Sequence, residues 1–355
     1  MDATELLRSL SQASGVSGYE DEVRTVAREA FAPHADDLRT DALGNLIAYK
    51  KGIGAQRTPP RAIMLAAHPD EIGLMVTAFE GDFLHVTKVG GVDLRVIAGQ
   101  EVLVHGRNPL KGVIASRPPH LTTPEERETV VPFEKLFVDV GLPAERIKEL
   151  VRVGDLITFR RDFITLSNGY VSGKAFDDRA GVASLILCLE VLSTMQHQWD
   201  VYAVATSQEE VGLRGATVSA YGVAPDIAIA VDVGFGAQAG VSEEESVAMD
   251  KGPAIARGPN IHPTMHERLV STAKEHEIPY QQEVVAGYTG TDAWAIQVAR
   301  EGIPTALLSV PERYMHTSVE TLCVRDIERT ARLMAQFIVG LDEDFAAQIV
   351  SREKE

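Results

Sequence analysis

The chain has 355 residues, of which 45% are hydrophobic and 24% charged, and its formal net charge is -17. That length predicts a large core and more than one domain, and the acidic balance argues against nucleic acid or an anionic membrane as a partner. No uncharged apolar run approaches the roughly 20 residues of a membrane span, no cysteine framework or signal peptide is evident, and we expect a cytoplasmic protein.

The first 70 residues have the pattern of an α/β protein. Apolar residues at helical spacing predict two amphipathic helices, over residues 4–14 and 19–31. The continuous apolar run 62–67 predicts a strand of a parallel sheet, and His68 and Asp70 follow directly after it. Two side chains that can bind a cation or move a proton therefore stand where this strand ends.

The pattern changes between residues 71 and 162. Short alternating runs separated by glycine or proline predict a small β-rich domain there. Helix and strand patterns then return, with helices over 182–194, 263–276, 293–300 and 324–341 and strands over 200–205, 226–231 and 305–310. We therefore predict that residues 71–162 are a domain inserted into an α/β catalytic domain made of residues 1–70 and 163–355.

Two adjacent carboxylates, Glu209 and Glu210, follow the predicted strand 200–205. In an open parallel sheet, ligands bind beyond the carboxyl ends of the strands. Two like charges side by side there perturb each other's pKa unless a cation lies between them. The pair therefore indicates a bound metal or one carboxyl that stays protonated, and a solvated acidic turn is the structural alternative.

Histidines and carboxylates recur at other predicted strand ends and in two loops. Mixed imidazole and carboxylate ligands suit Zn²⁺, Co²⁺ or Mn²⁺. One ion needs three or four protein ligands, so the set fits two divalent metal ions that share a bridging carboxylate. Glu209 is then free to act as a base, and Asp70 is placed to hold the His68 imidazole from behind. The candidate metal ligands are His68, Asp177, Glu210, Asp232 and His316.

These segments resemble the tetrahedral aminopeptidases, which are glutamyl, leucyl and lysyl aminopeptidases with two co-catalytic metals. The matching motifs are Ala67-His-Pro-Asp-Glu-Ile-Gly73, Lys174-Ala-Phe-Asp-Asp-Arg-Ala-Gly181, Thr206-Ser-Gln-Glu-Glu-Val-Gly-Leu-Arg-Gly215, Asp232-Val, Gly290-Thr-Asp292 and Arg313-Tyr-Met-His316. They occur in order over nearly the whole chain. The resemblance implies a central mixed sheet flanked by helices, with an inserted β domain that mediates assembly into a hollow dodecamer built from dimers.

The resemblance also implies a role for each site residue. His68, Glu210, Asp232 and His316 would be terminal ligands, and Asp177 would bridge the metals, with Asp178 as the alternative bridge. Glu209 would be the general base and Asp70 would orient His68. The expected reaction is removal of the N-terminal residue from short peptides by a water activated between two Zn²⁺ or Co²⁺ ions, with Mn²⁺ as an alternative. The sequence does not indicate which N-terminal residue is preferred.

Two other functions are compatible with parts of the sequence. A glycosidase uses carboxyls on opposite sides of a sugar bond, and some relatives of this family were described as endoglucanases. Adjacent Glu209 and Glu210 cannot easily straddle a substrate, however, and His68 and His316 would have no role. A non-catalytic assembly protein that kept the fold would be expected to lack a ligand or the base, and the sequence has all of them.

Overall fold

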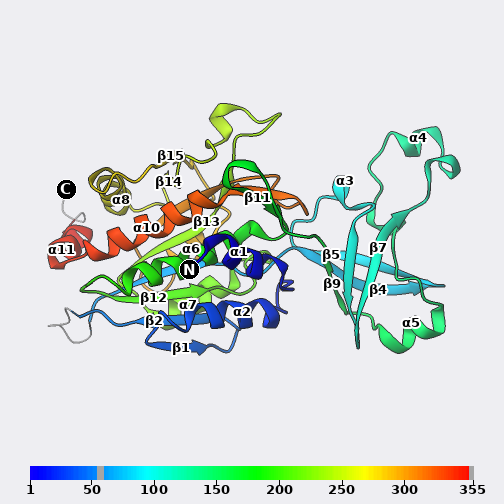
Figure 1. The fold of residues 1–355 in the computed structure, drawn as a ribbon, viewed down its shortest axis with the longest axis horizontal. Coiled ribbons are helices and arrows are strands. Elements are labelled where there is room, and N and C mark those ends of the chain that lie inside the picture. The colour runs from blue at the N-terminus through cyan, green and yellow to red at the C-terminus, as the bar shows by residue number, and fades with distance from the viewer. Residues whose placement is uncertain (54–59, 352–355) are drawn as a thin grey trace.

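The protein has two parts of unequal size, a larger α/β part and a β-barrel at the right of the view in Figure 1. The computed structural model describes residues 1–53 and 60–351. The larger part is a mixed sheet with helices on both faces, and the barrel is an insertion between two of its strands. The predicted fold class, a mixed sheet flanked by helices with a small β-rich insertion, is confirmed.

The large part is organised around an 11-stranded sheet. In spatial order its strands are β1 (Asp37–Thr40), β2 (Leu46–Lys50), β12 (Asp200–Ala205), β3 (Ala62–Ala67), β13 (Ile227–Phe235), β16 (Thr305–Arg313), β17 (Glu320–Cys323), β11 (Tyr170–Gly173) and β10 (Ile164–Thr165), with β14 (Ala254–Arg257) beside β16 and β15 (Gln281–Val284) beside β14. The central strands β12, β3, β13 and β16 run parallel to one another. Their carboxyl ends therefore meet at one edge of the sheet.

Helices cover both faces of this sheet, and strand β3 shows how they divide. Ile63 and Leu65 belong to one buried apolar cluster, and Met64 belongs to a second cluster on the opposite face, because successive strand side chains point to opposite faces. The first cluster includes α1 (Ala3–Gln12), α2 (Asp21–Phe31), α6 (Phe176–Leu192), α8 (Pro263–Glu275), α10 (Val324–Val339) and α11 (Glu343–Ser351). The second includes α7 (Arg214–Val223) and α9 (Asp292–Ile296).

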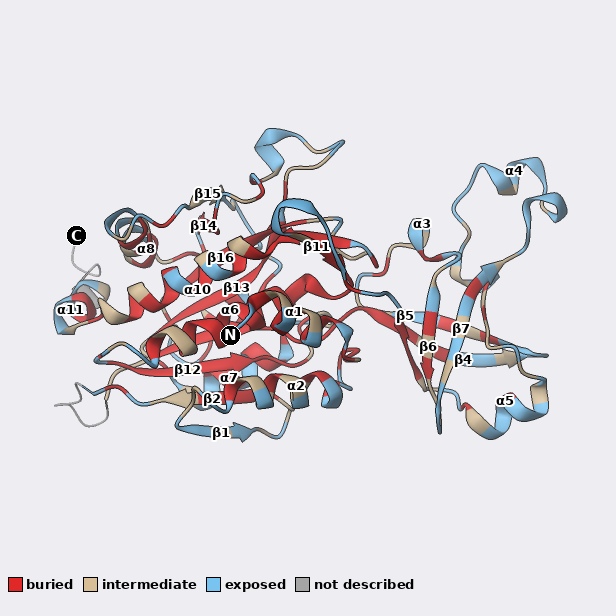
Figure 2. Cartoon of the chain, viewed as in Figure 1, coloured by how far each residue is buried: buried red, intermediate tan, exposed pale blue. Residues whose placement is uncertain are grey.

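The insertion is a closed barrel with its own core, which Figure 2 shows as a second red interior separate from that of the sheet. Around the barrel its strands are β4 (Gly73–Glu80), β5 (Phe83–Val89), β8 (Leu136–Asp139), β7 (Pro109–Ser116), β6 (Glu101–His105) and β9 (Leu156–Phe159). Short helices α3 (Leu94–Ile97), α4 (Pro124–Arg127) and α5 (Ala144–Leu150) lie in its connections, with 3-10 turns at Pro119–Leu121 and Phe133–Lys135. Two other 3-10 turns, Ser167–Gly169 and Glu243–Glu245, belong to the larger part. Closure pairs every strand on both sides, so the barrel leaves no free edge.

Two strands next to the site are longer than the sequence predicted. We expected strands over 226–231 and 305–310, but β13 continues to Phe235 and β16 to Arg313. Within β16 stands Pro311, which cannot donate a hydrogen bond to a sheet. In the structure it lies where β16 changes its outer partner from β14 to β17, so no ladder bond is lost there. Asp232 consequently lies within β13 rather than after it.

The junction between the two parts is held by a buried ion network. Glu71, at the start of the insertion, accepts hydrogen bonds from Lys174 Nζ at 2.7 and 2.8 Å and from Arg179 at 3.1 Å. All three side chains are buried, and Arg179 is fully so. Arg179 also donates to main-chain oxygens of Pro69 and of residues 10–13. The network joins the segment that enters the barrel to Lys174, which precedes α6, and to Arg179 near the start of α6.

Among the described residues, no helix is both long enough and apolar enough to cross a membrane.

Candidate active site

The parallel strands deliver the candidate residues to one cavity. His68 follows β3, Glu209 and Glu210 follow β12, and Asp232 is near the end of β13. Asp177 stands at the non-helical start of α6, and His316 follows β16. The structure brings these six residues together around a cavity of about 510 Å³. Apolar side chains such as Leu213, Val285 and Leu307, together with the loop Tyr288 to Thr291, line the rest of it.

The carboxylate of Asp177 lies between two imidazoles. Its Oδ1 is 3.2 Å from Nε2 of His68, and its Oδ2 is 3.1 Å from Nε2 of His316. Glu210 Oε1 lies 3.3 Å from the same nitrogen of His316, and Glu209 Oε2 lies 3.8 Å from Nε2 of His68. One carboxylate thus faces two clusters of nitrogen and oxygen atoms, one on each side.

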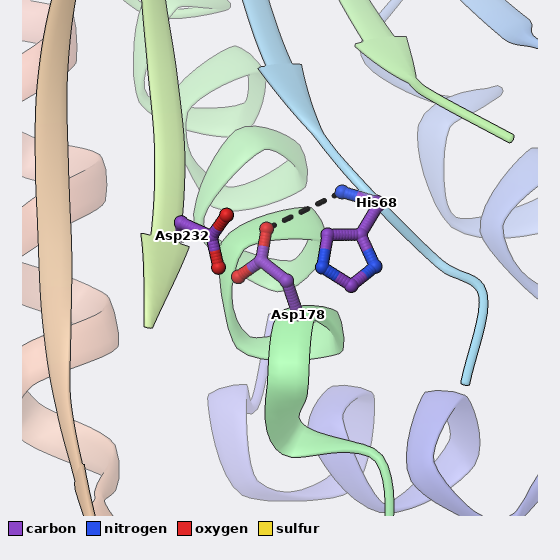
Figure 3. A group of neighbouring side chains, drawn as sticks. All are labelled: His68, Asp178 and Asp232. Carbon is purple, nitrogen blue, oxygen red and sulfur yellow. Dashed lines mark hydrogen bonds between the residues drawn. The ribbon is translucent and has the colours of Figure 1, made fainter. Parts of the chain in front are cut away.

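Two groups of side chains are close enough to hold metal ions, with their ligand atoms within 4.8 Å of one another: His68, Asp178 and Asp232, and Asp177, Glu210 and His316. Figure 3 shows the first group, in which the Asp178 carboxylate faces Asp232. Both Asp178 oxygens already accept backbone hydrogen bonds, from Gly181 at 2.9 Å and from His68 at 3.3 Å. Buried imidazole and carboxylate donors of this kind fit divalent ions such as Zn²⁺ or Co²⁺.

Asp70 supports the site from below without lining the cavity. Its side chain is fully buried, and Oδ1 lies 3.5 Å from Nδ1 of His68. The same carboxylate accepts hydrogen bonds from the backbone N–H groups of Glu209 at 3.0 Å and Glu210 at 3.2 Å, and from the Ser17 hydroxyl at 2.5 Å. Asp70 therefore links the His68 imidazole to the turn that carries both glutamates.

Glu320, which sequence reasoning missed, holds two of the site segments together. Its Oε2 accepts hydrogen bonds from the backbone N–H groups of Phe176 at 2.6 Å and Asp177 at 3.3 Å, and its Oε1 accepts one from His316 at 3.1 Å. The side chain is buried in β17. A lone glutamate within the otherwise uncharged run Val319 to Val324 was the available signal, since most acids in buried strands have hydrogen-bond partners.

The inserted barrel also touches the site through Gly91, a contact that the sequence does not indicate. The backbone oxygen of Gly91 lies 3.1 Å from Nδ1 of His316. A Cβ added at Gly91 would lie 2.5 Å from that nitrogen, so only glycine allows this approach. Ser318, two residues after His316, donates a hydrogen bond to the side-chain oxygen of Gln100 in the insertion at 3.0 Å. The orientation of His316 therefore depends on the barrel.

The site concentrates negative charge away from water. Burial raises the pKa of Glu209 to about 10, partly offset by His68 and reinforced by Asp232 and Asp292. Burial likewise raises the pKa of Asp232 well above its ordinary value. Asp177 differs, because hydrogen bonds with His316 and His68 outweigh burial and hold its pKa below the usual range. The buried acids repel one another, and a bound cation would relieve that repulsion, so the site is suited to cations.

The mixed sheet, the inserted barrel and the cavity of histidines and carboxylates define the chain as an α/β protein with a candidate metal site. A family model described as M42 glutamyl aminopeptidase matches residues 44–333, and the chain belongs to this family.

Individual relatives agree with this family. The lysyl aminopeptidase of Pyrococcus furiosus is 36% identical over 335 residues, covering 93% of this chain and 94% of the relative. The TET1 peptidase of Pyrococcus horikoshii, which can assemble into a tetrahedron or a large octahedral shell, matches with a TM-score of 0.84 at 34% identity, over 96% of this chain and 100% of that one. A structure named as an endoglucanase from Thermotoga maritima matches with a TM-score of 0.77 at 33% identity, over 97% and 99% of the two chains.

Proposed function

We propose that this protein is an aminopeptidase that removes the N-terminal residue of short peptides with the help of two divalent metal ions. The observation that carries the proposal is the Asp177 carboxylate between His68 and His316, with one oxygen toward each imidazole. His68 and Asp232 would help hold one ion, and Glu210 and His316 the other. Asp177 is preferred to Asp178 as the shared ligand because both Asp178 oxygens have backbone donors.

The protein side chains divide the remaining work. When bound, the two ions would lower the pKa of a water molecule to about 7 and polarise the scissile carbonyl. The Glu209 side chain lines the cavity, so it would accept the proton of the attacking water and pass it to the leaving amine. Asp70 would keep His68 oriented and fix the turn of Glu209 through its backbone N–H. The apolar wall of the cavity would receive the side chain of the residue to be removed.

We also infer that the protein forms a homo-oligomer, a dodecamer built from dimers, through the insertion at residues 71–162. The relative from Pyrococcus horikoshii assembles into closed shells. The insertion exposes large apolar side chains, among them Leu121 at 69% and Val130 at 51%, and exposed apolar groups are common at sites of protein association. A closed particle would admit only short or unfolded peptides.

A panel of aminoacyl-anilides, assayed with Zn²⁺, Co²⁺ or Mn²⁺, tests the activity. We expect hydrolysis of substrates with a free amino group and none of the same substrates after N-acetylation. A β-glucan belongs in the panel because of the endoglucanase name of one relative. Release of reducing sugar, with the anilides left intact, would favour a glycosidase and overturn the proposal.

A further inference from the structure

The turn that carries Glu209 is held in place by side chains from outside it. Four consecutive backbone N–H groups of this turn donate to side-chain oxygens: Ser207 to Asn45 at 2.8 Å, Gln208 to Glu20 at 3.1 Å, and Glu209 and Glu210 to Asp70 at 3.0 and 3.2 Å. Gln208 has a φ of 59°, in the left-handed region that residues other than glycine rarely adopt. A backbone of this kind persists only where its surroundings hold it, so these acceptors help to fix the turn.

Glu20 is the acceptor for the residue directly before the proposed base. Its side chain is 3% exposed, and its Oε1 accepts hydrogen bonds from the N–H groups of Gln208 at 3.1 Å and Gly18 at 2.7 Å. Glu20 precedes α2, but its side chain does not cap that helix. Burial and the charge of Asp70 raise the pKa of Glu20, so the carboxylate is costly to keep where it lies. The side chain thus serves the turn rather than its own helix.

The segment that ends in Glu20 is itself fixed to the chain that follows β3. Gly15 donates its N–H to Oε1 of Glu71 at 2.9 Å, and the N–H of Glu71 donates to the oxygen of Gly15 at 2.9 Å. The Ser17 hydroxyl donates to Oδ2 of Asp70 at 2.5 Å. Residues 15–20 therefore reach the turn twice, through Asp70 and directly through Glu20.

We propose that Glu20 is a positioning residue that holds the Glu209 carboxylate in place through the N–H of Gln208. The inference rests on the function proposed above, in which Glu209 is the general base. Glu209 lines the cavity, and Glu20 acts from behind the turn that presents it. A displacement of about 1 Å in a reacting group can lower the rate by roughly 100-fold. Loss of the Glu20 acceptor should therefore lower kcat without removing metal.

Two substitutions at Glu20 separate the position of its acceptor from its charge. Glu20→Asp keeps the charge but withdraws the acceptor by one methylene group, and Glu20→Gln keeps an oxygen at the same reach without the charge. On the aminoacyl-anilide that the wild type cleaves best, we expect Glu20→Asp to lower kcat by about 10- to 100-fold, with KM and metal content unchanged, and Glu20→Gln to stay within about threefold of the wild type. Glu29→Asp, on the exposed face of α2, is the matched control and should change nothing.

A double-mutant cycle with Glu209→Gln tests whether Glu20 acts through the base. If it does, Glu20→Asp should have no further effect on kcat once Glu209 is replaced, because the group that it positions is gone. A loss by the same factor in both backgrounds would overturn the inference, and so would loss of metal or of the folded state in Glu20→Asp, since either would mean a structural role.

The kinetics of the single variants also separate this inference from the proposed function. Wild-type kcat in Glu20→Asp, with a large loss in Glu209→Gln, would overturn the positioning role alone. An equal loss in Glu20→Asp and Glu20→Gln would also overturn it, because the charge rather than the acceptor would then matter. Normal kcat in Glu209→Gln, or no cleavage of any anilide by the metal-loaded wild type, would overturn the proposed function and this inference with it.

Discussion

Replacement of Glu71 by glutamine should destabilise the protein far more than the same change at its surface. The substitution keeps the size of the side chain and removes the charge that faces Lys174 and Arg179. Although burial acts to raise it, these two cations hold the pKa of Glu71 below its ordinary value. Burial lowers the pKa of Lys174 to about 8 even with Glu71 present. Without the carboxylate, two cations share a buried site with no anion to balance them.

The size of the effect follows from the burial of all three partners. Removing one partner of a buried ion pair costs about 3–5 kcal/mol, because the other charge is left uncompensated. An unfolding entropy of about 2.1 cal/mol/K per residue gives about 0.75 kcal/mol/K for 355 residues. The midpoint of thermal unfolding should therefore fall by roughly 4–7 °C if the chain unfolds as one unit.

Differential scanning calorimetry at fixed protein and metal concentration measures this shift, since bound metal would itself change the midpoint. Glu101→Gln is the matched control, because Glu101 pairs with Arg160 on the surface, where ion pairs contribute about 0–1 kcal/mol. The double variant Glu71→Gln with Lys174→Gln should recover part of the lost stability, since it removes one of the two unbalanced cations and Arg179 keeps its backbone acceptors. A midpoint for Glu71→Gln equal to that of Glu101→Gln would refute the reasoning.

Four further predictions concern the site and its link to assembly. Glu209→Gln should keep both metals and lower kcat by about 10²- to 10⁴-fold, as expected for loss of a general base. If mass spectrometry shows full metal content and kcat is nearly normal, another group is the base. His316→Ala and Asp232→Asn should each lose metal first and recover activity partly in excess metal, so an inactive variant that still binds two ions with wild-type affinity would contradict their role as ligands. Gly91→Ala should also weaken metal binding and lower activity, because its Cβ would lie 2.5 Å from the His316 ring. Gly222→Ala is the control and should change neither, since no atom lies within 4 Å of the new Cβ. Removal of metal by a chelator should convert large particles towards dimers, and addition of metal should reverse the change. The reason is that the barrel contacts His316 and that metal binding stabilises the fold that presents the ligands. If light scattering shows an unchanged particle, assembly does not depend on metal binding at the site.

The local pattern of the sequence was sufficient for the framework of the molecule. Apolar runs such as 62–67 predicted buried strands, and the change to short alternating runs after residue 71 predicted the β-rich insertion. The acids and histidines of the site could be listed for the same reason, because each lies close to one end of an element that is recognisable from neighbouring residues; Asp177 stands at the start of its helix and the others stand at or after the ends of strands. Their arrangement around one cavity follows from the parallel course of β12, β3, β13 and β16.

What the sequence by itself determined is therefore the set of elements and the polar residues at their ends, since both depend on periodicity over a few neighbouring positions. The tertiary structure alone decided which distant groups meet. Gly91 lies against His316 across 225 positions of the chain, Lys174 reaches Glu71 across 103, and Glu320 receives the N–H of Asp177 across 143. Such contacts have no local signal, because a buried charge or a close backbone approach is satisfied by partners that only folding brings together.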